Sequence, residues 1–113
     1  MAIEAACDLE PDILEALVKA RDTEESQLAK DVLELLLINA DMASREKMPV
    51  CQDTGICTVF ISVGQAAVIE GNLYDAVQKG VRLGYEEGYL RKSVCDPLTR
   101  KNTGTNTPAV IHF

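Results

Sequence analysis

The stretch that decides the fold is LAKDVLELLLINADMASREKMPVCQDTGICTVFISV, residues 28–63. Its first part repeats apolar residues at helical spacing, which predicts a helix that begins near Thr23 and has one buried face. That face consists of Leu28, Val32, Leu35, Leu36, Met42 and Ala43. The helix should end at residues 45–47, because the residue before Pro49 avoids the helical region. Residues 56–63 then alternate in the way typical of a strand, with Cys57 on the same side as three aliphatic residues.

Three further elements extend outward from this stretch. Residues 8–20 predict a first helix with Pro11 in its first turn, and residues 73–87 predict a third helix capped by Asn72. Residues 88–107 form a long polar connection, and such connections are usually functional or disordered. Residues 109–113 start a strand, which we expect to need pairing by residues beyond the chain or by another chain. The sequence predicts an α-rich α+β domain over residues 1–113, with about three helices packed on one or two short strands.

Composition limits the classes of protein. The chain has 113 residues, 47% of them hydrophobic and 26% charged, which suits one globular domain. Eighteen acidic against eleven basic residues give a net charge of −7, which argues against nucleic acid as a partner. No apolar stretch approaches the roughly 18 residues of a membrane span, and the N-terminus lacks the basic region of a signal peptide. We therefore expect a cytoplasmic protein without a membrane partner.

The four cysteines, Cys7, Cys51, Cys57 and Cys95, do not have the spacing of a known metal motif. Without a secretory signal, a disulfide framework is not expected. Cys57 is interpreted as a small core thiol. A weaker alternative is a redox or metal-sensing domain that uses Cys51, Cys57 and Cys95.

Two segments carry side chains suited to chemistry. Residues 48–55, MPVCQDTG, place a thiol, an amide, a carboxylate and a hydroxyl in consecutive positions between helix and strand. The plainer alternative is a turn in which Asp53 and Thr54 bond local amides. Arg91 lies in a locally basic segment and offers a planar fork of donors for a carboxylate, although a surface cation explains it equally simply. His112 is interpreted as a partly buried histidine without a catalytic partner.

Taken together, three segments resemble a known family. PVCQDTG at 49–55, LRKSV at 90–94 and KNTGTNTPA at 101–109 are similar to the ordered motifs of the iron–sulfur hydro-lyases, the class I fumarases and L(+)-tartrate dehydratases. The likeness covers nearly the whole chain, as the N-terminal part of the alpha subunit or alpha region. Alpha subunits of this family are much longer, which agrees with a sequence that stops inside a strand, so we expect a fragment.

The resemblance implies roles for four residues. Cys51 matches the first of three cysteines that hold a [4Fe–4S] cluster, and the other two have no counterpart in this chain. Gln52 and Asp53 match substrate-contacting residues, and Asp53 is the candidate for proton handling or for orienting the substrate hydroxyl. Arg91 matches an arginine that binds a substrate carboxylate. The segment 102–106 is recognisable as family sequence and is expected to shape the site.

The resemblance also implies an activity. We expect a hydro-lyase of the tricarboxylic acid cycle that reversibly hydrates fumarate to malate, with dehydration of L(+)-tartrate as the close alternative. The implied partners are a dicarboxylate substrate and a beta subunit or fused C-terminal region, in a homo-oligomer of that alpha–beta unit. A cluster of this kind is sensitive to oxygen, which favours an anaerobic cytoplasm. The 113 residues alone, with an incomplete ligand set, are expected to be an inactive structural or assembly module that self-associates.

Overall fold

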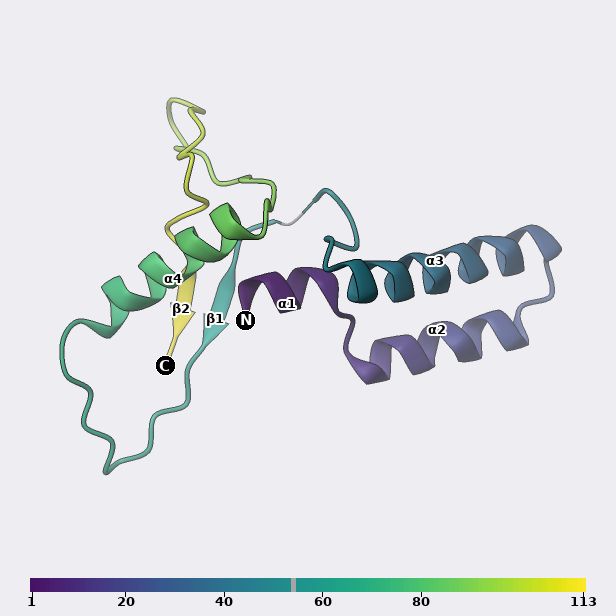
Figure 1. The fold of residues 1–113 in the computed structure, drawn as a ribbon, viewed down its shortest axis with the longest axis horizontal. Helices are drawn as coiled ribbons and strands as arrows, with labels where there is room; N and C mark the ends of the chain where they lie inside the picture. The colour runs from purple at the N-terminus through teal and green to yellow at the C-terminus, as the bar shows by residue number, and fades with distance from the viewer. Residues whose placement is uncertain (54) are drawn as a thin grey trace. The chain divides into compact units, whose positions relative to one another are not determined.

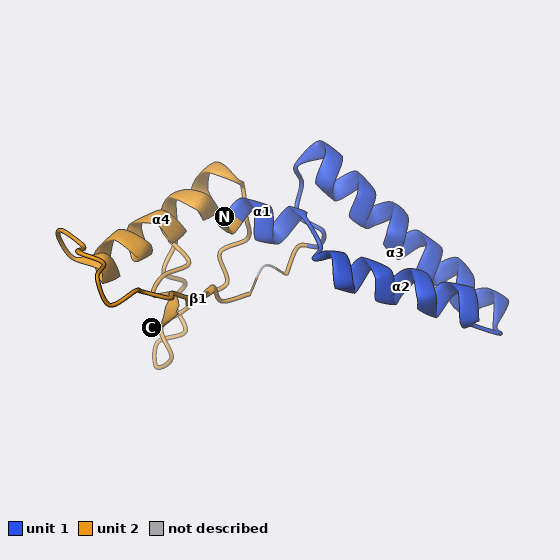
Figure 2. Ribbon diagram, turned by 90° about the horizontal axis from the view of Figure 1, so that it is seen from below, with its two compact units in different colours: residues 1, 3–51 blue, residues 2, 52–113 orange. Residues whose placement is uncertain are grey.

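The computed structural model describes residues 1–53 and 55–113, in the order α1, α2, α3, β1, α4 and β2 (Figure 1). The chain divides into two compact units (Figure 2). Unit 1 consists of residues 1 and 3–51, and unit 2 consists of residues 2 and 52–113. The α-rich α+β prediction with short strands is confirmed.

Unit 1 is helical. α1 spans Ala2–Cys7, α2 spans Pro11–Thr23 and α3 spans Gln27–Glu46. The sequence reading omitted α1, and α2 lies slightly further along the chain than the predicted 8–20, with proline in its first turn. None of the helices in the described part of the chain is long and apolar enough to cross a membrane.

α3 begins and ends for local reasons. The Ser26 hydroxyl caps its start by accepting a hydrogen bond from the Ala29 N–H at 3.5 Å. At its other end, Lys47 adopts a left-handed conformation with φ 53°, just before Met48 and Pro49, as the sequence predicts. α2 packs along α3, and the Arg21 guanidinium lies 2.8 Å from the Glu34 carboxylate.

The prediction of one buried face on α3 is confirmed at Ala43 and is otherwise wrong within unit 1. The buried residues of this helix are Ala40 and Ala43, whereas Leu28 is 75% and Leu35 65% exposed. The other expected members, Val32, Leu36 and Met42, are also exposed. A single neighbouring helix, α2, covers only part of an apolar stripe this long and wide. The apolar residues therefore repeat at helical spacing, but most of their side chains are not buried within unit 1.

Unit 2 contains a two-stranded parallel sheet. β1 (Thr58–Phe60) pairs with β2 (Val110–His112), with Val59 opposite Ile111. Parallel strands need a long crossover, and α4 (Leu73–Glu87) lies within it. The expectation that the strand at 109–113 must be paired from outside the chain is therefore wrong, because β1 pairs with it. Both strands are also shorter than predicted.

α4 occupies the predicted residues 73–87, and the predicted cap is confirmed by the bond from the Asp75 N–H to Asn72 Oδ1 at 3.2 Å. The buried apolar residues of unit 2 are Val81, Tyr85, Leu90, Val94 and Ala109. The Gln78 side chain ties α4 to the start of β2. Its Oε1 accepts from the Ala109 N–H at 2.7 Å, and its Nε2 donates to the Ala109 carbonyl at 3.0 Å.

The strand alternation is confirmed at Cys57, Val59 and Ile61, which are less exposed than the residues between them. It is wrong at Val63, which is exposed. Cys57 is half-buried, so the prediction of a core thiol is only partly confirmed. His112 is exposed and stacks on Phe60, with ring centroids 5.0 Å apart. The expectation of a partly buried histidine is wrong, because this two-stranded sheet leaves that face uncovered.

Candidate active site

The three motif segments occupy loops next to regular elements. Residues 49–55 connect α3 to β1, residues 90–94 follow α4, and residues 101–109 lead into β2. The last two segments lie wholly in unit 2, and the first crosses into unit 2 after Cys51. Loops held by rigid elements are where binding and catalytic groups concentrate, so this placement suits a site.

One buried asparagine bonds two of these loops from the third. Asn106 is 0% exposed, and its Oδ1 accepts hydrogen bonds from the Ser93 N–H at 2.6 Å and the Val94 N–H at 2.9 Å. Its Nδ2 donates to the carbonyl of Gly55 at 3.0 Å. Residues that lie 51 and 12 positions apart in the chain are thereby joined through one side-chain amide.

The second and third segments are also paired directly. The Thr103 N–H donates to the Val94 carbonyl at 2.9 Å, and Asn102 Nδ2 donates to the Lys92 carbonyl at 2.7 Å. Cys95 and Asn102 form an antiparallel bridge. These bonds order the loop of residues 92–103. This loop lies within the long polar connection, residues 88–107, that the sequence analysis expected to be functional or disordered.

Asp96 organises the tip of this loop. Its Oδ1 accepts from the Thr99 N–H at 2.6 Å, from the Thr99 hydroxyl at 2.9 Å and from the Leu98 N–H at 3.0 Å. The Thr99 backbone bond, followed by the hydroxyl bond, lowers the pKa of the Asp96 carboxyl. This carboxylate therefore shapes the loop.

Arg91 projects from a fixed base. Leu90 and Val94 on either side of it are 4% and 8% exposed, and the Leu90 N–H donates to the Tyr85 carbonyl of α4 at 3.0 Å. The Arg91 side chain itself is exposed. An exposed guanidinium in a loop held by buried residues can bind an anion without first ordering that loop.

Gln52 and Asp53, the other expected substrate contacts, are also exposed. Thr54 lies outside the described residues. Gly55 follows with φ 57°, a conformation in which any side chain would be strained. The structure thus brings the end of this segment to the Arg91 loop through Asn106.

The four cysteines differ in access. Cys51 is exposed, Cys57 and Cys95 are half-buried, and Cys7 is buried. Burial raises the pKa of the Cys7 and Cys57 thiols, which disfavours the thiolate that metals require. Within residues 1–53 and 55–113, no three side chains of metal-ligating type are grouped. Cys51 is therefore the most accessible of the four thiols.

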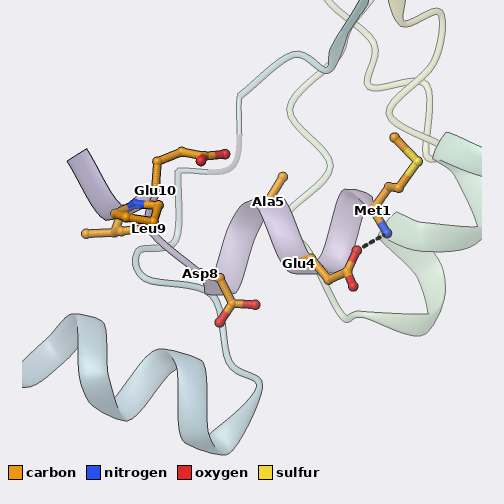
Figure 3. A pocket seen from close by; sticks show the side chains of 7 residues that line it. Met1, Glu4, Ala5, Asp8, Leu9 and Glu10 are labelled. Carbon is orange, nitrogen blue, oxygen red and sulfur yellow. Dashed lines mark ion pairs between the residues drawn. The ribbon is translucent and has the colours of Figure 1, made fainter. Parts of the chain in front are cut away.

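A separate hollow of about 400 Å³ lies in unit 1 (Figure 3). Its lining residues are Met1, Glu4, Ala5, Asp8, Leu9, Glu10 and Pro11. The Glu4 carboxylate lies 2.6 Å from the N-terminal amine, an ion pair drawn in Figure 3. None of these residues belongs to the three motif segments.

Sequence reasoning missed Gln78. It expected residues 102–106 to shape the site but gave Asn106 no role of its own. Both are amides that bond backbone groups of distant loops. Gln78 belongs to no motif, and the KNTGTNTPA motif that contains Asn106 does not reveal its bonds. One signal was available for Asn106, because asparagine tolerates the left-handed conformation that it adopts here, with φ 56°. That signal marks a turn and does not reveal its partners.

Comparison with known proteins gives a family match over the whole chain. The family model described as Fumarate hydratase (Fumerase) matches residues 1–113. All three segments fall within the match.

Individual relatives carry two kinds of name. An Escherichia coli K12 protein, "Fumarate hydratase class I, aerobic", is 39% identical over 94 residues, which cover 80% of this chain and 17% of the relative. A Methanocaldococcus jannaschii protein, provisionally named as L(+)-tartrate dehydratase subunit alpha, is 35% identical over 107 residues, covering 91% and 37%. The L(+)-tartrate dehydratase subunit alpha of E. coli K12 is 28% identical over 96 residues, covering 85% and 32%. The chain thus spans from about a sixth to just over a third of the length of these relatives.

Proposed function

The chain belongs to the Fumarate hydratase (Fumerase) family, and on that premise we propose that it is the N-terminal part of the alpha region of a [4Fe–4S]-dependent hydro-lyase. The proposed reaction is the reversible addition of water to fumarate, which gives malate. The observation that carries the proposal is the Asn106 amide, which bonds the loop of Arg91 to the segment that ends at Gly55. Parts of three family motifs that lie far apart in sequence are thereby joined within unit 2.

In this proposal the chain's own residues hold the substrate. Arg91 binds one carboxylate through two parallel N–H donors, since its planar guanidinium matches that geometry. Gln52 offers an amide to a second polar group of the substrate. Asp53 moves the proton at the carbon next to the departing hydroxyl, a step typically worth about 10² to 10⁴ in rate. All three side chains are exposed and so are accessible to a dicarboxylate.

Cys51 is the proposed cluster ligand of this chain. Its exposed thiol fits a ligand that completes a set supplied elsewhere, and the described residues contain no group of three ligating side chains. When bound, a cluster held by three thiolates supplies a Lewis-acidic iron for a substrate hydroxyl. Cys7, Cys57 and Cys95 take no part in this ligand set.

We propose the remaining features at the level of the whole protein. The other ligands come from residues outside these 113, and a beta subunit or C-terminal region completes the site in a homo-oligomer of the alpha–beta unit. The proposed location is the cytoplasm, and the proposed pathway is the tricarboxylic acid cycle. The names of the alpha-subunit relatives support a partner subunit. The 113-residue chain by itself is a structural module without activity.

Dehydration of L(+)-tartrate is the second candidate. The M. jannaschii relative with the tartrate dehydratase name is 35% identical, in an alignment that covers 91% of this chain. The same residue roles serve both reactions, because each removes or adds water next to a carboxylate. The choice between them depends on contacts around the second substrate carbon, which these residues alone do not fix.

The test uses the full-length alpha chain with its partner, reconstituted with iron and sulfide under anaerobic conditions. Loss of fumarate is followed by ultraviolet absorbance, and L(+)-tartrate is assayed in parallel. Cys51→Ala should abolish turnover and the cluster absorbance. Cys95→Ala, the matched control, removes a half-buried thiol and should retain both.

Three other outcomes would change the interpretation. Turnover of tartrate alone would keep the residue roles and change the substrate. A cluster that assembles equally well in Cys51→Ala would contradict the ligand assignment. No turnover of either substrate by the wild-type enzyme would contradict the proposed function.

A further inference from the structure

Asn106 lies at the centre of the candidate site without reaching its surface. Its side chain is fully buried, while the functional side chains expected on either side of it, Asp53 and Arg91, are exposed. We propose that Asn106 is the positioning residue that holds the Arg91 loop and the Asp53 segment in one register, so that both can engage a single dicarboxylate. This inference rests on the proposed function and assigns no chemical step to Asn106.

The chemistry of the amide explains why asparagine is needed. The oxygen accepts two backbone N–H groups, from Ser93 and Val94, and the nitrogen donates to the Gly55 carbonyl. Aspartate has the same shape but loses the donor, and leucine loses both functions. Glutamine carries the same groups one methylene further out, which does not fit a fully buried side chain without displacement.

The backbone at this position makes the same demand. Asn106 has φ 56°, in the left-handed region that asparagine tolerates better than most side chains. Two independent features therefore favour asparagine at this position: its left-handed conformation and its three hydrogen bonds. Glycine would keep the conformation and lose the bonds, which makes it a useful test substitution.

The three bonds act close to the functional residues. Ser93 lies two positions after Arg91, and Gly55 lies two positions after Asp53. We therefore expect a displacement at either anchor to move the functional residue two positions away. Misplacement by about 1 Å can cost about 10²-fold in rate, so a fixed register matters for a substrate bound at two points.

Other bonds stabilise one of these loops but do not reach the other. Thr103 and Asn102 bond to the carbonyls of Val94 and Lys92, and so they hold the Arg91 loop from one side. Neither bond extends to Gly55. Loss of the Asn106 amide would therefore leave a folded Arg91 loop whose register to the Asp53 segment is no longer set by that bond.

The experiment compares Asn106→Gly, Asn106→Asp and the control Asn72→Ala in the full-length alpha chain with its partner. Asn72→Ala removes the cap of α4, so it lowers stability without touching the motif loops. The readouts are KM and kcat for fumarate and tartrate, the Kd of succinate by calorimetry, and hydrogen exchange at the Ser93 and Val94 amides. Succinate is a dicarboxylate that cannot be dehydrated, so its binding reports on the site without turnover.

Asn106→Gly should raise KM and the succinate Kd about tenfold or more, with faster exchange at Ser93 and Val94. Asn106→Asp retains the acceptor, so protection of those amides should remain and the protein should fold. Its carboxylate faces the Gly55 carbonyl, however, and the repulsion should still raise KM and Kd about tenfold. Asn72→Ala should lower Tm while KM and Kd stay within about twofold.

The proposal is overturned if both Asn106 variants keep the wild-type KM and succinate Kd, because Asn106 would then be structural only. It is also overturned if Asn106→Gly leaves exchange at Ser93 and Val94 unchanged, since the anchor would not exist. A wild-type enzyme that turns over neither substrate but binds succinate refutes the proposed reaction, and the Kd values of the variants still decide this inference. A wild-type enzyme that neither reacts with nor binds a dicarboxylate refutes both.

Discussion

The α2–α3 hairpin of unit 1 and the loop assembly of unit 2 reach order in opposite ways. In the hairpin, regular helices carry long apolar side chains that remain exposed, such as Leu28 and Leu35. In unit 2, irregular loops are fixed because a polar side chain, Asn106, is completely buried and bonded. Local backbone bonding orders the first region, and specific bonds between distant residues order the second. Substitutions should therefore affect the two regions unequally.

The largest contrast is expected from one substitution made in both regions. Val81→Ala in α4 removes two methyl groups from a side chain that is 5% exposed and should cost about 2.5 kcal/mol of unfolding free energy. Val32→Ala in α3 makes the same change at a side chain that is 49% exposed and should change stability by about 0.5 kcal/mol or less. Urea unfolding measures both. Equal losses would mean that α3 is covered in the protein as it exists.

The next contrast concerns an amide in each region. Gln78→Ala leaves the N–H and carbonyl of Ala109 without their side-chain partner and should cost about 2 kcal/mol. Gln27→Ala removes an exposed bond to Asp31 within one helix and should cost about 0.5 kcal/mol or less. Hydrogen exchange at Ala109 should also increase in Gln78→Ala. An unchanged Ala109 amide would contradict the role assigned to Gln78.

Substitutions at helix caps should affect the two units about equally. Asn72→Ala in unit 2 and Ser26→Ala in unit 1 each remove a side chain that accepts from the first turn of a helix, at 3.2 and 3.5 Å. Each should cost about 1 kcal/mol, because a cap acts on its own helix wherever that helix lies. Circular dichroism during thermal unfolding checks this. A much larger loss at either cap would show that it also holds tertiary structure.

The smallest effect is expected from mild acidification. Bonds from the Thr99 backbone and hydroxyl lower the pKa of Asp96 in unit 2, and bonds from Ser44 and then Lys47 lower that of Asp8 in unit 1. A carboxyl with a lowered pKa stabilises the fold above its unfolded value, near 3.8, and this contribution is lost as pH falls through the folded value. Tm should therefore fall slightly on acidification towards and below pH 3.8.

Asp96→Asn provides the control for that measurement. The amide oxygen can accept the same bonds but does not titrate, so the acid-dependent fall in Tm should be smaller than in the wild type. Both proteins should behave alike near neutral pH. If Tm falls equally on acidification in Asp96→Asn and in the wild type, the carboxyl responsible is not Asp96.

Much of the secondary structure was predictable because it depends on neighbours in the chain. α4 occupies its predicted residues, with Asn72 as its predicted cap, because capping and periodicity are local properties. The end of α3 before Pro49 follows from the backbone restriction that proline imposes. α1 was missed, since six residues without a side-chain cap give little local signal.

The candidate site was only partly predictable. The motif at 49–55 and Arg91 are readable as residue types suited to a dicarboxylate, and resemblance to a family gave them an order. Which backbone groups hold these residues was not readable. Ser93, Val94 and Gly55 become neighbours only through Asn106, and a single sequence contains no record of that contact.

The sequence by itself determined the helical periods, the caps and breaks, the alternation around Val59 and the family motifs, because each depends on residues close together in the chain. Only the tertiary structure decided that β2 pairs with β1, that most of the stripe on α3 stays exposed within unit 1, and that Asn106 is buried with both polar atoms of its amide bonded. Those outcomes depend on which distant surfaces and backbone groups meet. That in turn depends on desolvation and hydrogen-bond satisfaction summed over the folded chain.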